Sequence, residues 1–281
     1  MEEIATAILG SPRRPPTVAS HGSVVATQRS ITRPHRDQPS RGSVPTFSVV
    51  IPTLEEAALI GGAVAALRQD ARVVEVIVAD GGSHDATCAL ARAAGARVVP
   101  SAAGRGVQMN AGARVAEATV LAFVHADCRL PPGAFDAMCA VLSRGDDAGV
   151  FAIDYRSPHP LLRLVSLLSH LRGPWTEFGE AALFVRRTRF ESLGGFPPWP
   201  LFEDVDLLAR LRRARTLGRA RGEVAVSPRR YLQRGVLRQQ AWNVLLLALF
   251  RLGFAPERLQ KWYEGCSPAF RRRAECAVPP G

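Results

Sequence analysis

Short apolar runs alternate with helix-like segments along the first half of the chain beyond residue 45. Runs rich in β-branched residues, such as Phe47 to Pro52 and Val74 to Asp80, are typical of buried parallel strands. Between these runs, apolar residues recur at helical spacing. This alternation predicts an α/β fold with a mostly parallel sheet and right-handed crossovers. The predicted strands are 47–52, 74–80, 96–100 and 119–127, and the predicted helices are 55–70, 85–95, 106–116 and 131–145.

The second half has a less regular pattern. It predicts a strand at 181–187 and helices at 161–171, 202–214 and 236–253. The segment 236–252 is apolar around most of a helical circumference, which predicts burial in protein or in lipid. It is too short, and too often interrupted by polar residues, to span a bilayer. The helix at 131–145 is expected to carry proline in its first turn.

The ends of the chain differ in composition from the part between them. Residues 1–45 are rich in Arg, Pro, Ser and Thr and show no hydrophobic period, which predicts a disordered extension. Residues 266–281 are interpreted as a tail. No secretory signal is visible near the N-terminus. The five cysteines are scattered and form no CxxC pair, which favours a reducing, cytoplasmic location.

Positive charge is concentrated in the C-terminal third. The chain has a net charge of +11, and residues 186–281 alone hold eighteen Arg and one Lys against eight acids. Phosphates, anionic lipid and nucleic acid are the partners that such a surface attracts, although a solvated basic face is the alternative. The basic residues are not interleaved with aromatic ones and fit no nucleic-acid motif, so we expect no nucleic-acid partner.

Three acidic residues stand at the predicted ends of strands. Glu55 follows the first strand, Asp80 ends the second, and Asp127 ends the strand 119–127. In an open parallel sheet, ligands bind beyond the carboxyl ends of the strands. Each acid alone is also compatible with a simple turn. Taken together, their order and spacing predict carboxylates that converge on one crevice.

Five segments carry a resemblance to a known family: "SVVIPTLEE", "VIVADGGSHDAT", "GRGVQMNAGARVA", "FVHADCRLPPG" and "GGFPPWPLFEDVDLLARLRR". From about Phe47 to Gly265 the chain resembles family-two glycosyltransferases with the GT-A fold, and most closely a bacterial subgroup whose metal motif reads His-Ala-Asp. The resemblance implies a Rossmann-like, mostly parallel sheet flanked by helices, with a C-terminal helical extension. The implied domain, 46–265, divides into a nucleotide-binding half (about 46–130), an acceptor half (about 131–235) and C-terminal apolar helices (236–265).

The resemblance also implies a binding site for a nucleotide-sugar donor. Leu54 departs from the family pattern, which usually has Asn at this position. Ser83 and Asp85 are interpreted as caps of the following helix. Arg105 could bind phosphate through two hydrogen bonds, whereas Asn110 is also compatible with helix packing. The implied donor-binding residues are Pro52, Thr53, Glu55, Asp80, Arg105, Asn110 and Asp127.

Asp127 matches the last acid of the family's metal motif. Mg²⁺ commonly binds few protein carboxylates and completes its shell with substrate phosphate, so one aspartate and a diphosphate suffice for Mg²⁺ or Mn²⁺. His125 stands two residues earlier, where the usual pattern has another acid. A neutral His can bind Mn²⁺ or phosphate, and it is also common as a hydrogen-bonded residue at a strand end.

The segment "FEDVD" matches the part of the family that carries the catalytic acids. By resemblance, Asp204 is the general base and Glu203 the residue that orients it. The alternative is that these acids merely complement a helix dipole. Arg229, Arg230 and Arg234 are expected to hold the leaving diphosphate or to face anionic lipid. The family's processive members end in a Gln-x-x-Arg-Trp motif, and its absence here favours transfer of a single sugar.

The expected reaction is inverting transfer of one sugar from a nucleoside diphosphate donor to a hydroxyl or carboxylate acceptor. A lipid-like acceptor, carotenoid or polyprenyl, would suit peripheral contact with the inner face of an anionic membrane. One alternative is a nucleotidyltransferase, although the chain lacks an early Gly-rich, Lys-bearing signature. Another alternative is a non-catalytic nucleotide-binding module.

Overall fold

An eight-stranded sheet forms the centre of the computed structural model, which describes residues 44–171, 173 and 182–265. The predicted extension up to residue 43 and the predicted tail at 266–281 lie outside the described residues. All described residues belong to one compact unit. The strands are β1 (Phe47–Thr53), β2 (Val73–Asp80), β3 (Arg97–Pro100), β4 (Val120–Phe123), β5 (Cys128–Arg129), β6 (Ala148–Asp154), β7 (Leu183–Arg186) and β8 (Leu217–Val226).

The strand order is β3-β2-β1-β4-β7-β6-β8-β5. The pairs β1–β2, β1–β4, β2–β3 and β6–β8 are parallel. Strand β7 runs antiparallel to both β4 and β6, and β5 runs antiparallel to β8. The prediction of an α/β fold with a mostly parallel sheet is therefore confirmed. A single sheet crosses both predicted halves of the domain, which pair with each other at β4–β7 and at β5–β8.

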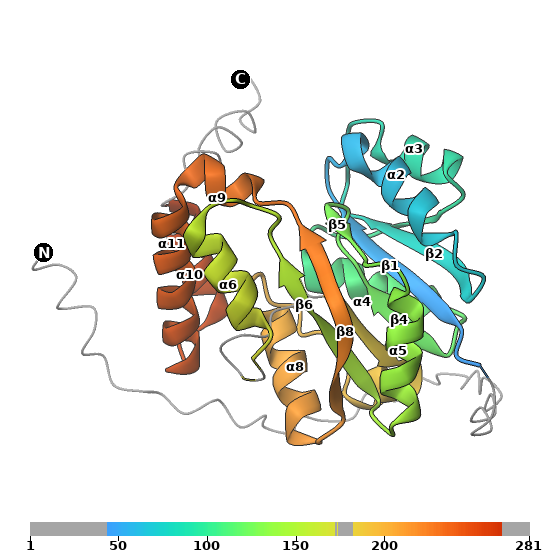
Figure 1. Ribbon diagram of the computed structural model, residues 1–281. Helices are drawn as coiled ribbons and strands as arrows, with labels where there is room; N and C mark the ends of the chain where they lie inside the picture. The colour runs from blue at the N-terminus through green and yellow to red at the C-terminus, as the bar shows by residue number, and fades with distance from the viewer. Residues whose placement is uncertain (1–43, 172, 174–181, 266–281) are drawn as a thin grey trace, which may run out of the picture. The chain divides into compact units, whose positions relative to one another are not determined.

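Helices cover the sheet and gather beside its C-terminal strands (Figure 1). Helices α2 and α3 pack together next to β2, and α4 packs against β1 and β2. Helices α6, α9, α10 and α11 lie together on one side of the sheet (Figure 1). The helices are α2 (Ala57–Leu67), α3 (Thr87–Ala93), α4 (Arg105–Val115), α5 (Ala134–Ser143), α6 (Pro160–Ser169), α7 (Arg187–Ser192), α8 (Glu203–Arg213), α9 (Arg229–Arg234), α10 (Val236–Arg251) and α11 (Pro256–Gly265).

The central strand β1 explains why its sequence is a continuous apolar run. All seven of its residues are buried, because strands pair with it on both edges and helix α4 covers it. Gly112 of α4 makes this close packing feasible. A Cβ at Gly112 would lie 2.4 Å from Cγ1 of Val50, so a larger residue would push the helix off the sheet. The core continues through Phe151 and Phe184 on the other side of β4.

Several predicted boundaries differ from the structure. Strand β4 ends at Phe123 rather than at residue 127, so His125 and Asp127 lie in the turn that follows. The prolines expected in the first turn of the helix at 131–145 come before it, because α5 begins at Ala134 after a left-handed Gly133. Strands β6 and β8 were not predicted. Within the described residues, every helix falls short of the length and apolarity that crossing a bilayer requires.

Candidate active site

The ends of β1 and β2 are joined by the carboxylate of Asp80. Thr53 pairs with Asp80 across the two strands, and its hydroxyl donates to Asp80 Oδ1 at 3.2 Å. The loop after β2 adds three donors: the Ser83 hydroxyl to Oδ1 at 2.6 Å, and the Gly82 and Ser83 amides to Oδ2 at 3.0 and 2.8 Å. Burial would raise the pKa of Asp80, but these hydrogen bonds outweigh it and hold the pKa below its ordinary value. Asp80 is therefore an ionised anchor for the loop.

The predicted residue Glu55 lies beside the same loop. Its amide donates to the Ser83 hydroxyl at 2.9 Å, and its carboxylate accepts from the His84 amide at 2.7 Å. Glu55 has a φ of 60°, in the left-handed region that is uncommon for residues other than glycine. Asp85 accepts from the Thr87 amide at 2.9 Å, but it lies one residue before Ala86, the N-cap of α3, and Ser83 bonds to Asp80. Neither side chain is therefore the cap of α3 that the sequence predicted.

Gln108 is a site residue that the sequence analysis missed. It is 4% exposed, and its Nε2 donates to the carbonyls of Thr53 at 2.7 Å and Ala79 at 2.9 Å. The side chain thus ties the ends of β1 and β2 together from helix α4. A polar residue on the buried side of a helix is the signal that could have revealed it, because buried polar groups are normally hydrogen-bonded.

The predicted catalytic acids lie at the start of helix α8. Glu203 is 1% exposed and Asp204 is 9% exposed. Arg105, the first residue of α4, places its Nε 3.0 Å from Glu203 Oε1. The next residue of α4, Gly106, permits this approach, because a Cβ there would lie 2.8 Å from the Pro197 carbonyl and 3.2 Å from Glu203 Cβ. The structure therefore brings a predicted donor-binding residue and the predicted acid pair together.

Burial dominates the electrostatics of Glu203. It raises the pKa of the carboxyl, the neighbouring Asp204 adds to the increase, and Arg105 opposes it. Oε1 faces Arg105, whereas Oε2 is buried and has no hydrogen-bond partner within the part of the chain that the structure describes. A buried oxygen without a partner costs free energy, which is a common feature of binding and catalytic sites.

A small recess of about 10 Å³ lies beside the acid pair. That volume holds about one water molecule. His125 reaches the recess from the turn after β4, so the structure brings it close to the two acids. The recess is lined by Arg105, Met109, Phe123, His125, Leu183, Phe196, Glu203 and Asp204.

Two further residues shape the entrance to α8. Asn110 donates to the Phe196 carbonyl at 2.8 Å and accepts from the Phe196 amide at 3.0 Å. Its amide therefore positions the chain ahead of α8, and its contact with a nucleotide-sugar stays a prediction. Phe202, directly before Glu203, has a φ of 65°, which is an outlier for a bulky residue. Such strain is concentrated at functional sites, where the surrounding packing maintains it.

Asp127 is exposed in the tight turn between β4 and β5. The Cys128 amide donates to the His125 carbonyl at 3.1 Å and closes that turn. Among residues 44–171, 173 and 182–265 there is no group of three His, Cys, Asp or Glu side chains that could hold a metal ion. The donor set therefore does not fit a cation held by protein alone. It does fit a hard cation that binds one carboxylate and takes its other ligands from substrate phosphate and water.

The predicted arginines of α9 lie with the C-terminal helices. Arg234 donates to Gln239 Oε1 at 3.3 Å and to the Tyr263 hydroxyl at 2.9 Å, and it also lies over the Tyr263 ring. Arg229 is exposed, and the side chain of Arg230 lies outside the described part. These contacts place Arg234 against α10 and α11, and Arg234 is not one of the residues that line the recess.

Residues 48–187 match the family model described as Glycosyl transferase family 2. The chain contains a glycosyltransferase family 2 domain. The protein is thus an enzyme of the glycosyltransferase class, which favours glycosyl transfer over the nucleotidyltransferase and the non-catalytic module considered above. No curated protein matches the chain significantly in sequence.

Solved structures show the same fold. Glucosyl-3-phosphoglycerate synthase from Mycobacterium tuberculosis, in complex with phosphoglyceric acid, matches at 23% identity and a TM-score of 0.56, covering 78% of this chain and 86% of that chain. The same enzyme with Mn²⁺, uridine diphosphate and glucosyl-3-phosphoglycerate matches at 22% identity and a TM-score of 0.53, with the same coverage. Mannosyl-3-phosphoglycerate synthase from Rubrobacter xylanophilus matches at 18% identity and a TM-score of 0.53, covering 74% of each chain. These likenesses support the GT-A fold.

Proposed function

We propose that the enzyme transfers one sugar from a nucleoside diphosphate sugar to an acceptor hydroxyl or carboxylate, with inversion at the sugar. The observation that carries this proposal is the buried acid pair Glu203 and Asp204, held against Arg105 where α4 and α8 meet. The complexes of structural neighbours with uridine diphosphate support a uridine nucleotide as the donor.

The donor would lie across the carboxyl ends of β1 and β2. Pro52, Thr53 and Glu55 line the edge where the base and ribose are expected. Asp80 keeps the 81–83 loop in place through the hydrogen bonds described above, and its own contact with the nucleotide is part of the proposal. The diphosphate would reach the turn that holds Asp127, with Arg105 near the sugar.

Asp127 would hold a divalent cation, with His125 as a second donor and the diphosphate supplying further oxygens. When bound, Mg²⁺ or Mn²⁺ offsets the negative charge that grows on the departing diphosphate. Structural neighbours in complex with Mn²⁺ and with Mg²⁺ support this assignment.

Asp204 would act as general base. It accepts the proton of the acceptor hydroxyl while that oxygen forms a bond to the anomeric carbon, and the bond to the diphosphate breaks on the opposite face of the sugar. Glu203 orients Asp204 by fixing the first turn of α8 to Arg105. Burial of the pair excludes water that would compete with the acceptor.

The acceptor would be lipid-like, either a carotenoid or a polyprenyl compound, taken from the inner face of a bacterial membrane. Support comes from the proximity of helix α10 to the acids. Phe250 of α10 stacks on Phe202 with ring centroids 4.7 Å apart. The ring centroid of Trp199 lies 6.0 Å from that of Phe250. A soluble phosphorylated acid, as named for the structural neighbours, is the competing acceptor class.

A panel of nucleotide sugars tests the donor and cation assignments together. With and without Mn²⁺, we expect one donor to raise the melting temperature and to be hydrolysed slowly. At a hundredfold excess over Kd, binding stabilises the fold by about 2.7 kcal/mol. Asp127→Asn should remove the Mn²⁺-dependent part of donor binding and leave the fold intact.

The matched control for this variant is Asp136→Asn, an exposed acid on α5 that pairs with Arg72 at 2.6 Å and does not line the recess. Donor affinity and Mn²⁺ dependence should remain unchanged in this control. If Asp127→Asn keeps both the affinity and the Mn²⁺ dependence of the native enzyme, the cation assignment is wrong.

A further inference from the structure

Helix α6 turns its leucine-rich side outward. Its buried side carries Leu162 and Ser169, with Val165 and Ser166 half-buried between them. The opposite side carries leucines at the i, i+3, i+4, i+7 spacing that normally marks the face of a helix turned toward the core. Leu167, at the centre of this outward side, is 67% exposed. The four exposed leucines are Leu164, Leu167 and Leu168 on α6 and Leu171, two residues after its end.

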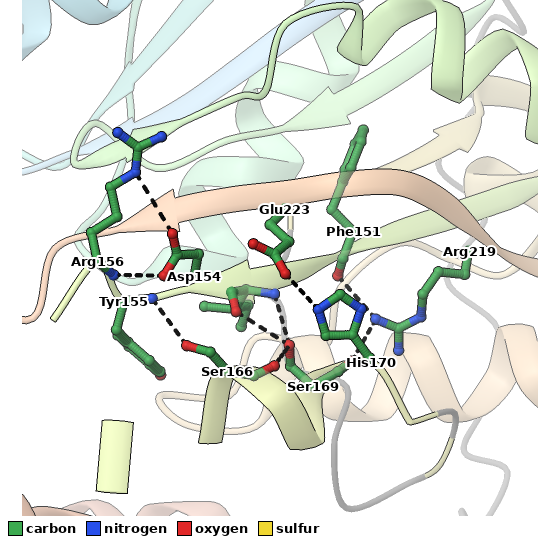
Figure 2. A network of polar contacts seen from close by, with 10 residues as sticks. Phe151, Asp154, Tyr155, Arg156, Ser166, Ser169, His170, Arg219 and Glu223 are labelled. Carbon is green, nitrogen blue, oxygen red and sulfur yellow. Dashed lines mark hydrogen bonds and ion pairs between the residues drawn. The ribbon is translucent and has the colours of Figure 1, made fainter. Parts of the chain in front are cut away.

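Polar contacts fix this orientation of α6 (Figure 2). The Ser169 hydroxyl accepts from the Ile153 amide at 2.9 Å, and the Tyr155 amide donates to the Ser166 hydroxyl at 3.2 Å. Arg219 of β8 donates to the carbonyls of Ser169 at 2.6 Å and Leu171 at 3.2 Å. These bonds attach the serine side of the helix to β6 and β8. The leucines therefore cannot turn inward without breaking them.

Helix α10 packs beside α6 and repeats the arrangement. Its buried side includes Gln239, Leu246 and Leu247, so the apolar residues of this helix are divided between two sides. Leu237, at the start of the outward side, is 73% exposed. The outward side consists of Leu237, Ala241, Val244, Leu245 and Leu252, spaced at i, i+4, i+7, i+8 and i+15.

Basic residues border both outward sides. Exposed Arg163 flanks the leucines of α6, where exposed His170 is hydrogen-bonded to Glu223 at 2.6 Å, and exposed Arg238 and Arg251 flank the stripe of α10. Residues 229–265 contain six Arg and one Lys against two Glu, a net charge of +5. An apolar stripe bordered by cations is the arrangement of helices that lie in the plane of an anionic membrane surface.

A cavity of about 330 Å³ lies at the edge of the α10 stripe. Arg238 belongs both to the border of the stripe and to the lining of this cavity. Two arginines and a tyrosine in one cavity suit a phosphate group, because guanidinium groups bind phosphate through paired hydrogen bonds. The lining residues are Arg234, Arg238, Gln239, Trp242 and Tyr263.

We propose that the outward sides of α6 and α10 form a docking surface for an anionic lipid bilayer. The leucines enter the boundary between headgroups and acyl chains, and the arginines, including those of the cavity, contact lipid phosphates. This surface deepens the proposed function by naming its membrane partner. It also places α10 at the level of the lipid. Because Phe250 of α10 stacks on Phe202, the segment directly before Glu203 lies at the same level.

Vesicle flotation of the full-length protein tests the proposal. The probes are vesicles of phosphatidylglycerol in phosphatidylcholine, with pure phosphatidylcholine vesicles for comparison. We expect binding to the anionic vesicles at low salt. The double variants Leu164→Ser/Leu167→Ser on α6 and Leu237→Ser/Leu245→Ser on α10 should each lower the partition coefficient about tenfold or more.

The matched control is Leu59→Ser/Leu90→Ser, which changes two leucines of similar exposure, 41% and 42%, on α2 and α3. Vesicle binding should be unchanged in this control. Donor hydrolysis should be unchanged in all three variants, which separates failure of the membrane surface from failure of the proposed catalysis. Each variant retains the basic residues 1–45, so a difference in vesicle binding between variants does not come from this extension.

Two outcomes overturn the proposal. The first is vesicle binding that the α6 and α10 variants leave unchanged. The second is absence of binding to the anionic vesicles at low salt. A dimer, measured by light scattering, that the α10 variant dissociates would then assign the outward sides to contact between two copies of this chain. Arg238→Glu tests the contribution of charge. The ratio of binding to anionic vesicles over binding to phosphatidylcholine vesicles should fall further in this variant than in the leucine variants.

Discussion

The nucleotide side of the sheet and the α6–α10 surface use apolar residues in opposite ways. At β1, β4 and the second half of β2 the apolar residues are buried, and polar residues such as Thr53 and Asp80 gather at the strand ends. In α6 and α10, polar residues such as Ser169 and Gln239 are buried and leucines face outward. Apolar spacing along a helix therefore marks the side that needs covering, which is not always the side that faces the core.

The largest expected effect falls on Asp204, which lies between these two regions. Asp204→Asn should lower kcat about 10²–10⁴-fold, the usual contribution of a positioned acid or base, and leave donor binding nearly unchanged. Steady-state kinetics and donor calorimetry measure the two quantities. Near-normal turnover would assign the base to another residue or indicate a carboxylate acceptor, which needs no deprotonation by the enzyme.

Stability measurements sharpen the contrast between inward and outward leucines. Leu121→Ala in β4 should lower the free energy of unfolding by about 2–5 kcal/mol, because it leaves a cavity in the core. Leu237→Ala in α10 should change it by less than about 0.5 kcal/mol. Urea denaturation of both variants checks this difference. A loss of similar size for Leu237→Ala would show that the outward side of α10 is covered.

The hydrogen bonds at the end of β2 make a smaller contribution. Asp80→Asn should destabilise the fold by about 1–3 kcal/mol, since it weakens charge-assisted bonds to the 81–83 loop. Because the pKa of Asp80 is lowered in the folded state, this stability is present above the unfolded value of about 3.9 and is lost as pH falls through the folded value. As pH falls from neutral to acidic, the difference in melting temperature between the native and variant proteins should therefore shrink. A difference that does not change with pH would contradict the assignment of Asp80 as an ionised anchor of the loop.

Glu203 should show the smallest effect, with the opposite sign. The pKa of Glu203 is raised mainly by burial. Ionising this carboxyl in the folded state therefore lowers the free energy of unfolding. This loss is absent below the unfolded pKa of about 4.3 and grows as pH rises through the folded value. At neutral pH, Glu203→Gln should raise Tm by about 2–4 °C while it lowers turnover. At low pH the two melting temperatures should converge. A lower Tm for Glu203→Gln at neutral pH would mean that its ion pair with Arg105 outweighs the cost of burial.

The sequence alone determined the features that depend on local order along the chain. Strand–helix alternation predicted the mostly parallel sheet, and this prediction is confirmed. Carboxylates at strand ends predicted that Glu55, Asp80 and Asp127 converge on one crevice, because parallel strands expose their carboxyl ends at one edge. The structure brings Glu55 and Asp80 to the same loop after β2, and the approach of Asp127 to a shared ligand stays a prediction. The sequence did not reveal β6 and β8, because their apolar runs contain glycine and charged residues and lack a clean period of two.

The tertiary structure decided which groups contact one another and which sides of the helices remain exposed. Arg105 and Glu203 lie almost a hundred residues apart, and Gly106 lets their helices approach closely enough for an ion pair. Burial raises the pKa of Glu203, and no local pattern encodes burial. Likewise, the leucines of α6 have the spacing of a core-facing helix, but Ser166, Ser169 and Arg219 attach its other side to the sheet. Periodicity defines the sides of a helix, and only the long-range bonds to β6 and β8 determine which side faces inward.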